Sequence, residues 1–183
     1  MALGTDYELQ DCALARALEV VGERWSLLIV RDAFYGVQRF NDFLTHLGIP
    51  RAVLTARLNA LVAAGVLRKE PYQYAPLRHG YLLTEAGLEL WAPLYLLSRW
   101  GGRHATPDGP RHLFAHAACG TDLDRAGACP RCGRFVPPGE VVIRPNPGRG
   151  GAPRTDPVSL ALAGPHRLLE PLASAAPSTS HSA

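Results

Sequence analysis

A group of histidine and cysteine residues within residues 112–133 gives this sequence its clearest chemical signal. His116 and Cys119 are separated by two residues, as are Cys129 and Cys132, and glycine follows the second member of each pair. Two such knuckles offer the four nitrogen and sulfur ligands that tetrahedral Zn²⁺ prefers in structural sites. Because four protein ligands leave no position for water, the predicted role of this zinc is structural rather than catalytic.

Other interpretations of these cysteines stay open at the level of sequence. His112 could replace His116 as the histidine ligand. Cys129 and Cys132 could instead form a redox dithiol or a disulfide, or the cluster could be a relic that holds no metal. Structural disulfides are disfavoured in a reducing cytoplasm, where clustered cysteines more often bind metal or carry out redox chemistry. We therefore take a zinc site as the first hypothesis.

The second signal is a helix after Pro50 that has one apolar face and one low, polar face. Leu54, Leu58 and Leu61 recur at helical spacing. The opposite face carries only small or hydrogen-bonding side chains, at Arg51, Ala52, Thr55, Ala56 and Asn59. A helix of this kind can lie in a DNA major groove, which is about 12 Å wide.

The residues on either side of this helix complete the pattern of a winged helix-turn-helix. Residues 41–47 have the length of the bracing helix that packs behind a recognition helix. Residues 66–70 and 81–84 predict two strands, joined by a proline-containing loop over residues 71–78. The bland alternative is an ordinary helical core with a solvated hairpin, and the order of the elements favours DNA binding over it.

Basic residues gather on this part of the chain although the formal net charge is only +3. Five basic residues and one acidic residue lie between positions 51 and 78, and such a local basic surface is what neutralises DNA phosphates. We expect Arg51, Thr55 and Asn59 to face base edges. We expect the remaining basic residues to hold phosphates and the wing, namely Arg57, Arg68, Lys69 and Arg78.

Helices before and after this region should supply the core and an oligomer interface. Residues 11–21 predict an amphipathic helix, and residues 25–34 are apolar nearly all round and predict a buried central helix. Thr84 should open a further helix that runs to about Trp100 with a kink at Pro93. Its many apolar residues, including Leu88, Leu94, Trp91 and Tyr95, predict a dimer interface. The alternative is that this helix packs on the first helix of the same chain.

An ordered set of motifs within residues 10–102 resembles the HxlR family of bacterial winged-helix transcription regulators. The matching positions are Cys12, GERWSLLI at 22–29, Gly36, RFN at 39–41, LTARL at 54–58, Pro71, Tyr72, Pro76, Arg78, YLLT at 81–84, Gly87 and Trp100. The resemblance implies a homodimer that binds double-stranded operator DNA near its own or an adjacent gene.

Cys12 has two interpretations. In several proteins that resemble this chain, a cysteine at this position senses oxidants or electrophiles, and a thiol near a helix N-terminus can have a lowered pKa. Its neighbour Asp11 is acidic and would oppose that shift. The alternative is a small residue that packs at the helix start. Cys12 is therefore a candidate redox sensor, and an oxidant or a small molecule is a candidate effector.

Length and composition limit the remaining classes. The 183 residues are 47% hydrophobic, enough for one domain of about 100 to 150 residues and an appendage. No apolar run approaches the roughly 18 residues that a membrane span needs, and the first residues lack the features of a signal peptide. We therefore expect a cytoplasmic location and no membrane partner. An enzyme is not expected, because no phosphate loop, nucleophile elbow or open metal site is evident.

The sequence thus predicts a mainly α fold with a small β-hairpin wing (α+β) and a zinc-ribbon-like C-terminal module. Residues 1–102 would form the winged-helix DNA-binding and dimerisation domain, 103–111 a linker and 112–144 the cysteine-rich module. Residues 145–183 are rich in Pro, Gly, Ala and Ser and predict a largely disordered tail, apart from an apolar stretch at 158–173 that could form a short helix or docking segment.

The function predicted from these observations is sequence-specific transcription regulation, most simply repression by a homodimer that responds to redox state or to a small ligand. The alternative is a protein-interaction module. In that case the zinc ribbon would contact a protein partner, and the winged helix would not read DNA.

Overall fold

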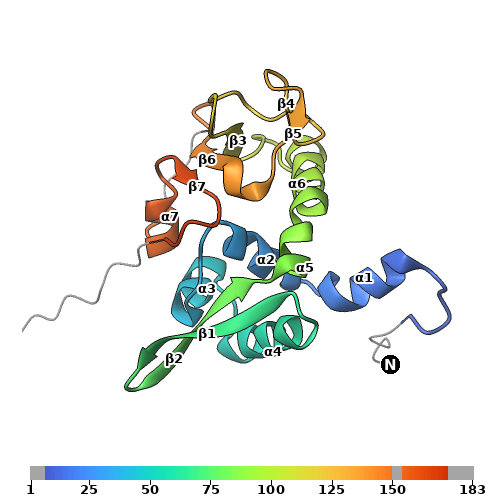
Figure 1. Cartoon of the computed structure of the whole chain (residues 1–183), viewed down its shortest axis with the longest axis vertical. Helices are drawn as coiled ribbons and strands as arrows, with labels where there is room; N and C mark the ends of the chain where they lie inside the picture. The colour runs from blue at the N-terminus through green and yellow to red at the C-terminus, as the bar shows by residue number, and fades with distance from the viewer. Residues whose placement is uncertain (1–6, 150–153, 173–183) are drawn as a thin grey trace, which may run out of the picture.

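The computed structural model describes residues 7–149 and 154–172 (Figure 1). Its first half is a winged helix, and its second half is a small β module that lies at the other end of a long helix (Figure 1). The elements of the first half are α1 (Ala13–Val21), α2 (Ser26–Phe34), α3 (Phe40–Leu47), α4 (Arg51–Ala63), β1 (Leu67–Tyr74), β2 (Leu77–Leu83), α5 (Glu85–Glu89) and α6 (Trp91–His104). No helix within the described ranges is long and apolar enough to cross a membrane.

The helix-turn-helix consists of α3 and α4, and its local sequence explains its shape. Gly48 ends α3 in the left-handed region at φ +62°, where its amide donates to the carbonyl of Leu44. Leu54, Leu58 and Leu61 of α4 are fully buried, as their spacing predicts. The recognition helix is thus held by one apolar stripe, and its opposite face is free of the core.

The wing is longer than the sequence indicates. β1 and β2 pair antiparallel from Leu67 opposite Leu83 to Tyr74 opposite Leu77. The expected loop over residues 71–78 is therefore largely strand, with the turn at residues 75–76. Pro71 is tolerated because it lies where the register shifts and because this sheet has only two strands, so each strand is an edge.

The expected kinked helix after Thr84 is two separate helices. The Thr84 hydroxyl accepts a hydrogen bond from the Gly87 amide at 3.1 Å and caps α5, as predicted. The chain then breaks at Leu90, and Pro93 lies in the first turn of α6. Proline costs little there because the first helical amides have no intrahelical partner. A new helix start replaces the kink.

The cysteine-rich module is built on a three-stranded antiparallel sheet of order β3-β6-β7. Its elements are β3 (His112–His116), β4 (Ala128–Cys129), β5 (Arg134–Phe135), the short 3-10 helix η1 (Pro138–Glu140), β6 (Val141–Pro145), α7 (Pro157–Ala161) and β7 (His166–Arg167). The hairpin of β4 and β5 carries the second knuckle. The third strand, β7, comes from the stretch that the sequence assigns to the tail.

Residues 154–172 are ordered and docked, and they include most of the apolar stretch 158–173 that the sequence offers as a short helix or docking segment within an otherwise disordered tail. Val158, Leu162 and Leu168 are buried in the common core. The amide of Leu169 donates to the carbonyl of Phe34 at 2.8 Å. Gly36, at φ +89°, lets this segment pass, because a Cβ there would lie 1.8 Å from the carbonyl oxygen of Glu170. Residues 150–153 and 173–183 of the expected tail lie outside the described residues.

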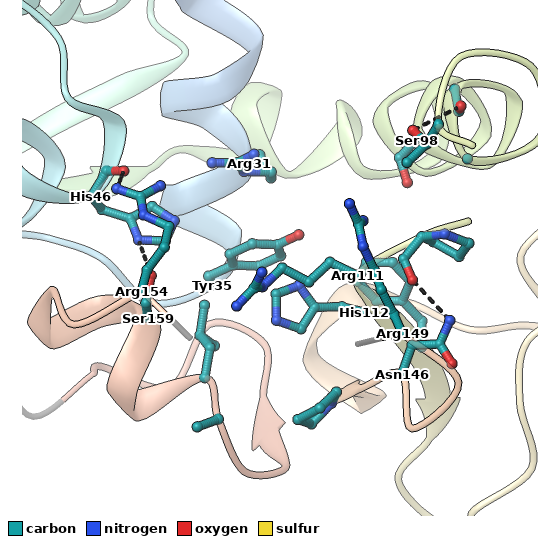
Figure 2. Close-up of a pocket in the computed structure, with 18 residues that line it drawn as sticks. Arg31, Tyr35, His46, Ser98, Arg111, His112, Asn146, Arg149, Arg154 and Ser159 are labelled. Atoms are coloured by element: carbon teal, nitrogen blue, oxygen red, sulfur yellow. Dashed lines mark hydrogen bonds between the residues drawn. The ribbon is translucent and has the colours of Figure 1, made fainter. Parts of the chain in front are cut away.

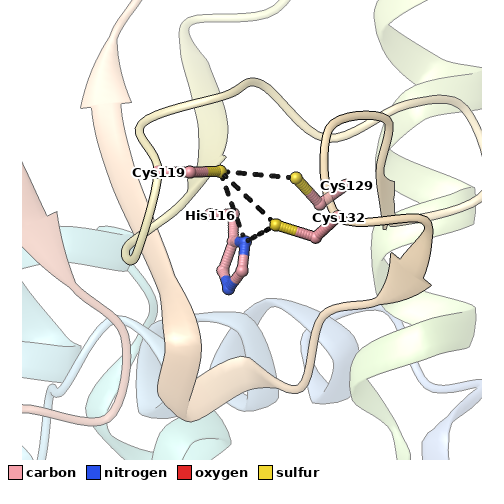
Figure 3. A group of neighbouring side chains, drawn as sticks. All are labelled: His116, Cys119, Cys129 and Cys132. Carbon is pink, nitrogen blue, oxygen red and sulfur yellow. Dashed lines mark hydrogen bonds between the residues drawn. The ribbon is translucent and has the colours of Figure 1, made fainter.

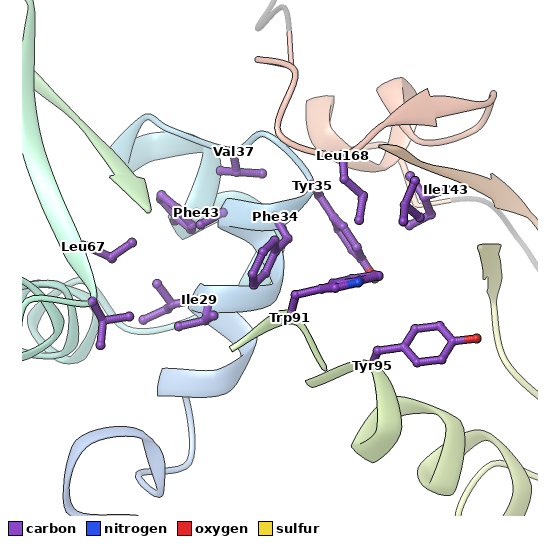
Figure 4. Packing of buried hydrophobic residues seen from close by; sticks show 14 of the residues in the cluster. Ile29, Phe34, Tyr35, Val37, Phe43, Leu67, Trp91, Tyr95, Ile143 and Leu168 are labelled. Carbon is purple, nitrogen blue, oxygen red and sulfur yellow. The ribbon is translucent and has the colours of Figure 1, made fainter. Parts of the chain in front are cut away.

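One aromatic cluster joins the winged helix to the module (Figure 4). Trp91 and Tyr95 are 3% and 2% exposed, and both rings lie 5.6 Å from the ring of Phe114 on β3. Trp91 Nε1 donates to the Val136 carbonyl at 3.3 Å, and the Tyr95 hydroxyl donates to the Asp124 carbonyl at 2.7 Å. Trp91 and Tyr95, expected at a dimer interface, are thus buried within the chain.

Candidate metal centre and nucleic-acid interface

Four side chains of the module converge on one point between β3 and the β4–β5 hairpin (Figure 3). His116 Nδ1 lies 3.5 Å from Cys119 Sγ and 3.4 Å from Cys132 Sγ. Cys119 Sγ lies 3.5 Å from Cys129 Sγ and 3.9 Å from Cys132 Sγ. A tetrahedron with Zn–S bonds of about 2.3 Å and Zn–N bonds of about 2.0 Å has edges of roughly 3.5 to 3.8 Å. The four atoms therefore lie close enough together to hold a metal ion.

Two matching backbone turns place the ligands. In each turn, the amide of the second ligand and the amide of the following glycine donate to the carbonyl of the first ligand, at 3.2 and 2.8 Å in both cases. The glycines are Gly120 and Gly133, at φ +69° and +66°. This left-handed conformation is costly for residues with a Cβ. The Cys-Gly pairs of the sequence are thus a requirement of the turn.

A carboxylate lies behind the histidine ligand. His116 is 2% exposed, and its Nε2 lies 3.2 Å from Oε2 of Glu140, which also contacts Arg134. A hydrogen bond from Nε2 leaves Nδ1 unprotonated and directed at the sulfurs, as in many metal sites with a carboxylate partner. His116 therefore occupies the position of the ligand, whereas His112 lines a separate cavity.

The electrostatics of the thiols also suit a cation. The Thr121 hydroxyl and backbone lower the pKa of the Cys119 thiol to about 6 through hydrogen bonds. The neighbouring Cys129 sulfur, with burial and Cys119, raises the pKa of Cys132 to about 11. Three sulfurs at this spacing can all ionise only if a cation lies among them. Cys129 and Cys132 are free thiols, so this structure does not contain the alternative disulfide.

The proposed base-reading residues share the outer face of α4. Arg51, Thr55 and Asn59 are exposed, and the Thr55 hydroxyl donates to the Arg51 carbonyl at 2.9 Å. Lys69 of β1 reaches this face, where its Nζ donates to Asn59 Oδ1 at 3.0 Å. The recognition helix and the first strand of the wing thus contribute to a single surface.

The other predicted phosphate contacts are more scattered. Arg57 lies on the flank of α4, with Nη1 3.5 Å from Oε2 of Glu23. Arg68 pairs with Glu70 on the same strand, and Arg78 is exposed on β2, opposite Gln73. Of this group, Lys69 is the residue that hydrogen-bonds to one of the predicted base-reading residues, Asn59. The sequence gives the number of basic residues in this region, whereas the fold determines which of them lie near the outer face of α4.

Sequence reasoning did not single out Arg39, which precedes α3. Its guanidinium lies 5.0 Å from the ring centre of Tyr72 on β1 and so joins α3 to the wing. Arg51 stacks similarly on Phe40, at 5.2 Å. The pairing of a helix start with an aromatic residue of the wing depends on the tertiary fold, although Arg39 and Tyr72 both belong to the matched family motifs.

Cys12 is exposed at the start of α1 and is not among the four clustered ligands. Its side chain makes no capping hydrogen bond, and α1 has no acidic residue in its first turn. The structure thus places this thiol in contact with solvent and outside the candidate metal centre.

Comparisons with known proteins agree with this architecture. The model of the HxlR-like helix-turn-helix family matches residues 20–109. An uncharacterised HTH-type transcriptional regulator of Mycobacterium tuberculosis is 44% identical over 137 residues, which cover 74% of this chain and 87% of that protein. The HTH-type transcriptional regulator YdeP of Bacillus subtilis is 30% identical over 106 residues, covering 56% of this chain and 83% of that protein.

A solved structure extends the similarity to three dimensions. PA1607, described as a candidate transcription factor, superposes with a TM-score of 0.59 at 33% identity and covers 70% of this chain and 91% of its own. The 137-residue mycobacterial alignment is longer than the 109 residues up to the end of the family match, so the similarity continues into the module. The chain belongs to the HxlR-like helix-turn-helix family and is a transcriptional regulator of the HTH type.

Proposed function

We propose that this regulator is a repressor that recognises a specific operator as a homodimer, with α4 in the major groove and the wing along the backbone. The observation that carries the proposal is the outer face of α4, where Thr55 and Asn59 lie exposed beside Lys69. The thirteen residues of α4 include no acidic side chain. Hydrogen-bonding groups on a helix without negative charge suit the edges of bases between two rows of phosphates.

The contacts divide by their place on this surface. Arg51, Thr55 and Asn59 read base edges, because they project from the exposed face of the recognition helix. Lys69 lies next to them and holds a phosphate at the groove edge. The arginines farther out would bind the backbone on either side, namely Arg57, Arg68 and Arg78. Phosphate contacts set the register, and base contacts set the sequence.

Exposed apolar side chains support the homodimer. Leu14 and Leu18 of α1 and Leu96, Leu97 and Trp100 of α6 are exposed. Burial of such side chains against a second copy would remove apolar area from water. A two-fold dimer would present two copies of α4 to half-sites about one helical turn apart. Light scattering from the purified chain tests this stoichiometry.

The metal centre supports a structural zinc ion. Its four ligands are three sulfurs and one imidazole nitrogen, a common ligand set for Zn²⁺. The strands that carry the second knuckle are two residues long and would gain most of their order from the bound ion. The proposed role of zinc is to hold the module over Trp91 and Tyr95, outside the DNA interface.

Fluorescence anisotropy tests the DNA proposal directly. The reduced, metal-loaded chain is titrated onto DNA from upstream of its own coding region and onto a scrambled duplex of the same composition. Preferential binding to the native DNA is expected. Equal binding to both duplexes at several salt concentrations would contradict sequence-specific autoregulation. Binding to neither would favour the protein-interaction module.

A repeat of this titration after mild oxidation tests the redox response. Loss of binding that is absent in a Cys12→Ser variant would assign sensing to the exposed thiol. Loss in both proteins, accompanied by metal release, would assign it to the cluster. Unchanged binding in both would remove oxidants from the candidate effectors and leave a small ligand.

A further inference from the structure

A cavity of about 530 Å³ lies between the winged helix and the module, with part of its wall from residues 154–172 of the module (Figure 2). Its walls come from α2, α3, α6, β3, β6 and α7. Four arginines and two histidines line it, and none of its described lining residues is acidic. Its volume is within the range of about 300 to 1,000 Å³ that small-molecule sites occupy. The DNA-reading surface does not use this cavity.

The positive charge of the cavity is only partly balanced. Arg31 pairs with Asp32 at 2.7 Å, and Arg154 pairs with Asp156 at 3.2 Å. Arg149 donates to a neutral acceptor, the carbonyl of Gly109, at 3.0 Å. No salt bridge joins Arg111 or Arg149 to a carboxylate in the described part of the chain. These two guanidiniums are therefore the groups that an incoming anion would meet.

The imidazole of His112 lies in the same positively charged part of the cavity. Burial, followed by the charges of Arg111 and Arg31, lowers the pKa of His112 to about 4. The ring lies 6.1 Å from that of Tyr35 in an edge-on arrangement, and Figure 2 shows both beside Arg111. Cationic and flat aromatic groups thus surround one space. An anion held there would reduce the repulsion among the cations.

An apolar cavity of about 230 Å³ adjoins the first. The two share Arg31, Tyr35, Ser98 and Phe114 as lining residues. The other walls of the second cavity are almost entirely apolar, contributed by Leu27, Leu28, Phe34, Trp91, Leu94, Tyr95 and Leu97. The two cavities thus share a wall, and a cationic space beside an apolar one suits a molecule with an anionic head and an apolar body.

We infer that this double cavity binds a small organic acid as effector, with its carboxylate on Arg111 and Arg149 and its apolar body beyond Phe114. Arginine forms paired hydrogen bonds with carboxylates, which gives such a site its preference for acids over neutral analogues. The inference rests on the proposed function only for the role of effector. His46 of α3 also lines the cavity, so the helix that braces α4 forms part of the wall of the proposed effector site.

Calorimetric titration of the full-length, metal-loaded chain tests the binding step without DNA. The probes are benzoate, phenylacetate and octanoate, with benzyl alcohol and inorganic phosphate for comparison. At least one acid should bind about tenfold more tightly than benzyl alcohol and phosphate, a difference of about 1.4 kcal/mol. Binding of none of the three acids would overturn the inference. Tighter binding of phosphate than of any acid would overturn the proposed ligand class.

Two variants locate the site. Arg111→Ala and Arg149→Ala should each weaken binding of the best acid about tenfold, whereas Arg125→Ala, an exposed arginine of the module, should leave it unchanged. Circular dichroism checks the fold of each variant. If one variant does not fold, the other still tests the assignment. Unchanged affinity in a folded variant would contradict the assignment.

The effector role and the DNA proposal fail in distinguishable ways. If the chain binds acids but no operator, the site stands and the proposed function falls. If it binds its operator but no acid, the proposed function stands and the effector site is wrong. Where both bind, the acid should change the affinity for operator, and the operator should change the affinity for the acid by the same factor.

Discussion

Asn59 and Lys69 form the contact that links the recognition helix to the wing. Their hydrogen bond, 3.0 Å long, lies on the exposed side of the molecule. Exposed polar contacts of this kind contribute little to stability because water competes for both groups. Both side chains can therefore exchange this contact for one with DNA at small cost. In the proposed DNA interface, the polar groups of these two side chains thus stay available for binding.

Substitution of Asn59 should separate base reading from phosphate binding. Asn59→Ala should relax the preference for one base pair by about 1 to 3 kcal/mol, because an asparagine amide can pair with both acceptor and donor on an adenine edge. Arg78→Ala should weaken binding to every sequence and reduce the salt slope by about one. Anisotropy titrations at a series of salt concentrations measure both effects. An unchanged slope for Arg78→Ala would remove this residue from the phosphate contacts.

Glu140 should tune the metal centre although it is not a ligand. Glu140→Gln keeps the shape of the side chain and removes the charge that orients His116. Loss of such a partner lowers metal affinity by about 10- to 100-fold. Zinc transfer to a chromogenic chelator measures the affinity, and Glu89→Gln, on the exposed side of α5, is the matched control. Equal zinc affinity in Glu140→Gln and wild type would show that Glu140 only forms a surface ion pair with Arg134.

At the scale of elements, the sequence predicts those features that depend on residues close together in the chain. The spacing of Leu54, Leu58 and Leu61 specifies α4, and the two knuckles specify the four side chains that lie close enough together to hold a metal ion, because each pattern spans only a few residues. Glu140 could not be found this way. It reaches His116 because the register of β3 and β6 sets that histidine opposite Val141, and register between distant strands depends on the tertiary fold.

The tail has an average composition typical of disorder, although the sequence offers its apolar stretch at 158–173 as a short helix or docking segment. Val158, Leu162 and Leu168 are too few to raise the mean hydropathy of a Pro- and Gly-rich stretch, yet each is buried. A second local signal lies just before this stretch. Asp156 followed by Pro157 is the usual start of a helix, and Asp156 does cap α7 by accepting a hydrogen bond from the Ser159 amide at 3.0 Å.

Docking of α7 on α3 should depend on the ionisation of Asp156. Burial alone would raise its pKa, but hydrogen bonds from Ser159 and His46 outweigh burial and lower the pKa to about 2. A carboxyl whose pKa falls on folding stabilises the native state above its unfolded pKa of about 3.9. This contribution, about 2 kcal/mol as an upper estimate, is lost as pH falls from about 4 to 2.

Chemical denaturation of Asp156→Asn against wild type measures this contribution. The difference in unfolding free energy should be largest at pH 6 and should become small near pH 2, because the wild-type carboxyl is then almost fully protonated in the unfolded state and about half protonated in the native state. Comparison at the same pH cancels the effects of acid on the metal ligands. Asp108→Asn, an exposed carboxyl of the linker, should show no such trend. A difference that does not vary with pH would assign the effect to packing instead.

At the scale of the whole molecule, the winged helix and the module share a single core. The Trp91 ring lies 5.5 Å from Phe34 of the winged helix and 5.6 Å from Phe114 of the module. Residues on both sides of the linker expected at residues 103–111 therefore pack into one core. An event in the module, such as metal loss, acts on a side chain that also packs against α2, and α2 in turn contacts α3 and α4.

Metal removal should therefore lower the stability of the whole chain, not only that of the module. Chelation should disorder the two-residue strands of the β4–β5 hairpin, expose Trp91 and Tyr95 to water, and lower the melting temperature of the whole chain in one transition. Tryptophan emission should shift to longer wavelength, and added Zn²⁺ should restore both signals. Cys12→Ser should respond like wild type, because Cys12 is not a ligand, whereas Cys129→Ser should melt at the lower temperature with or without chelator. Metal release with an unchanged melting temperature would show that apolar contacts alone hold the module, and the zinc would then stabilise nothing beyond its own knuckles.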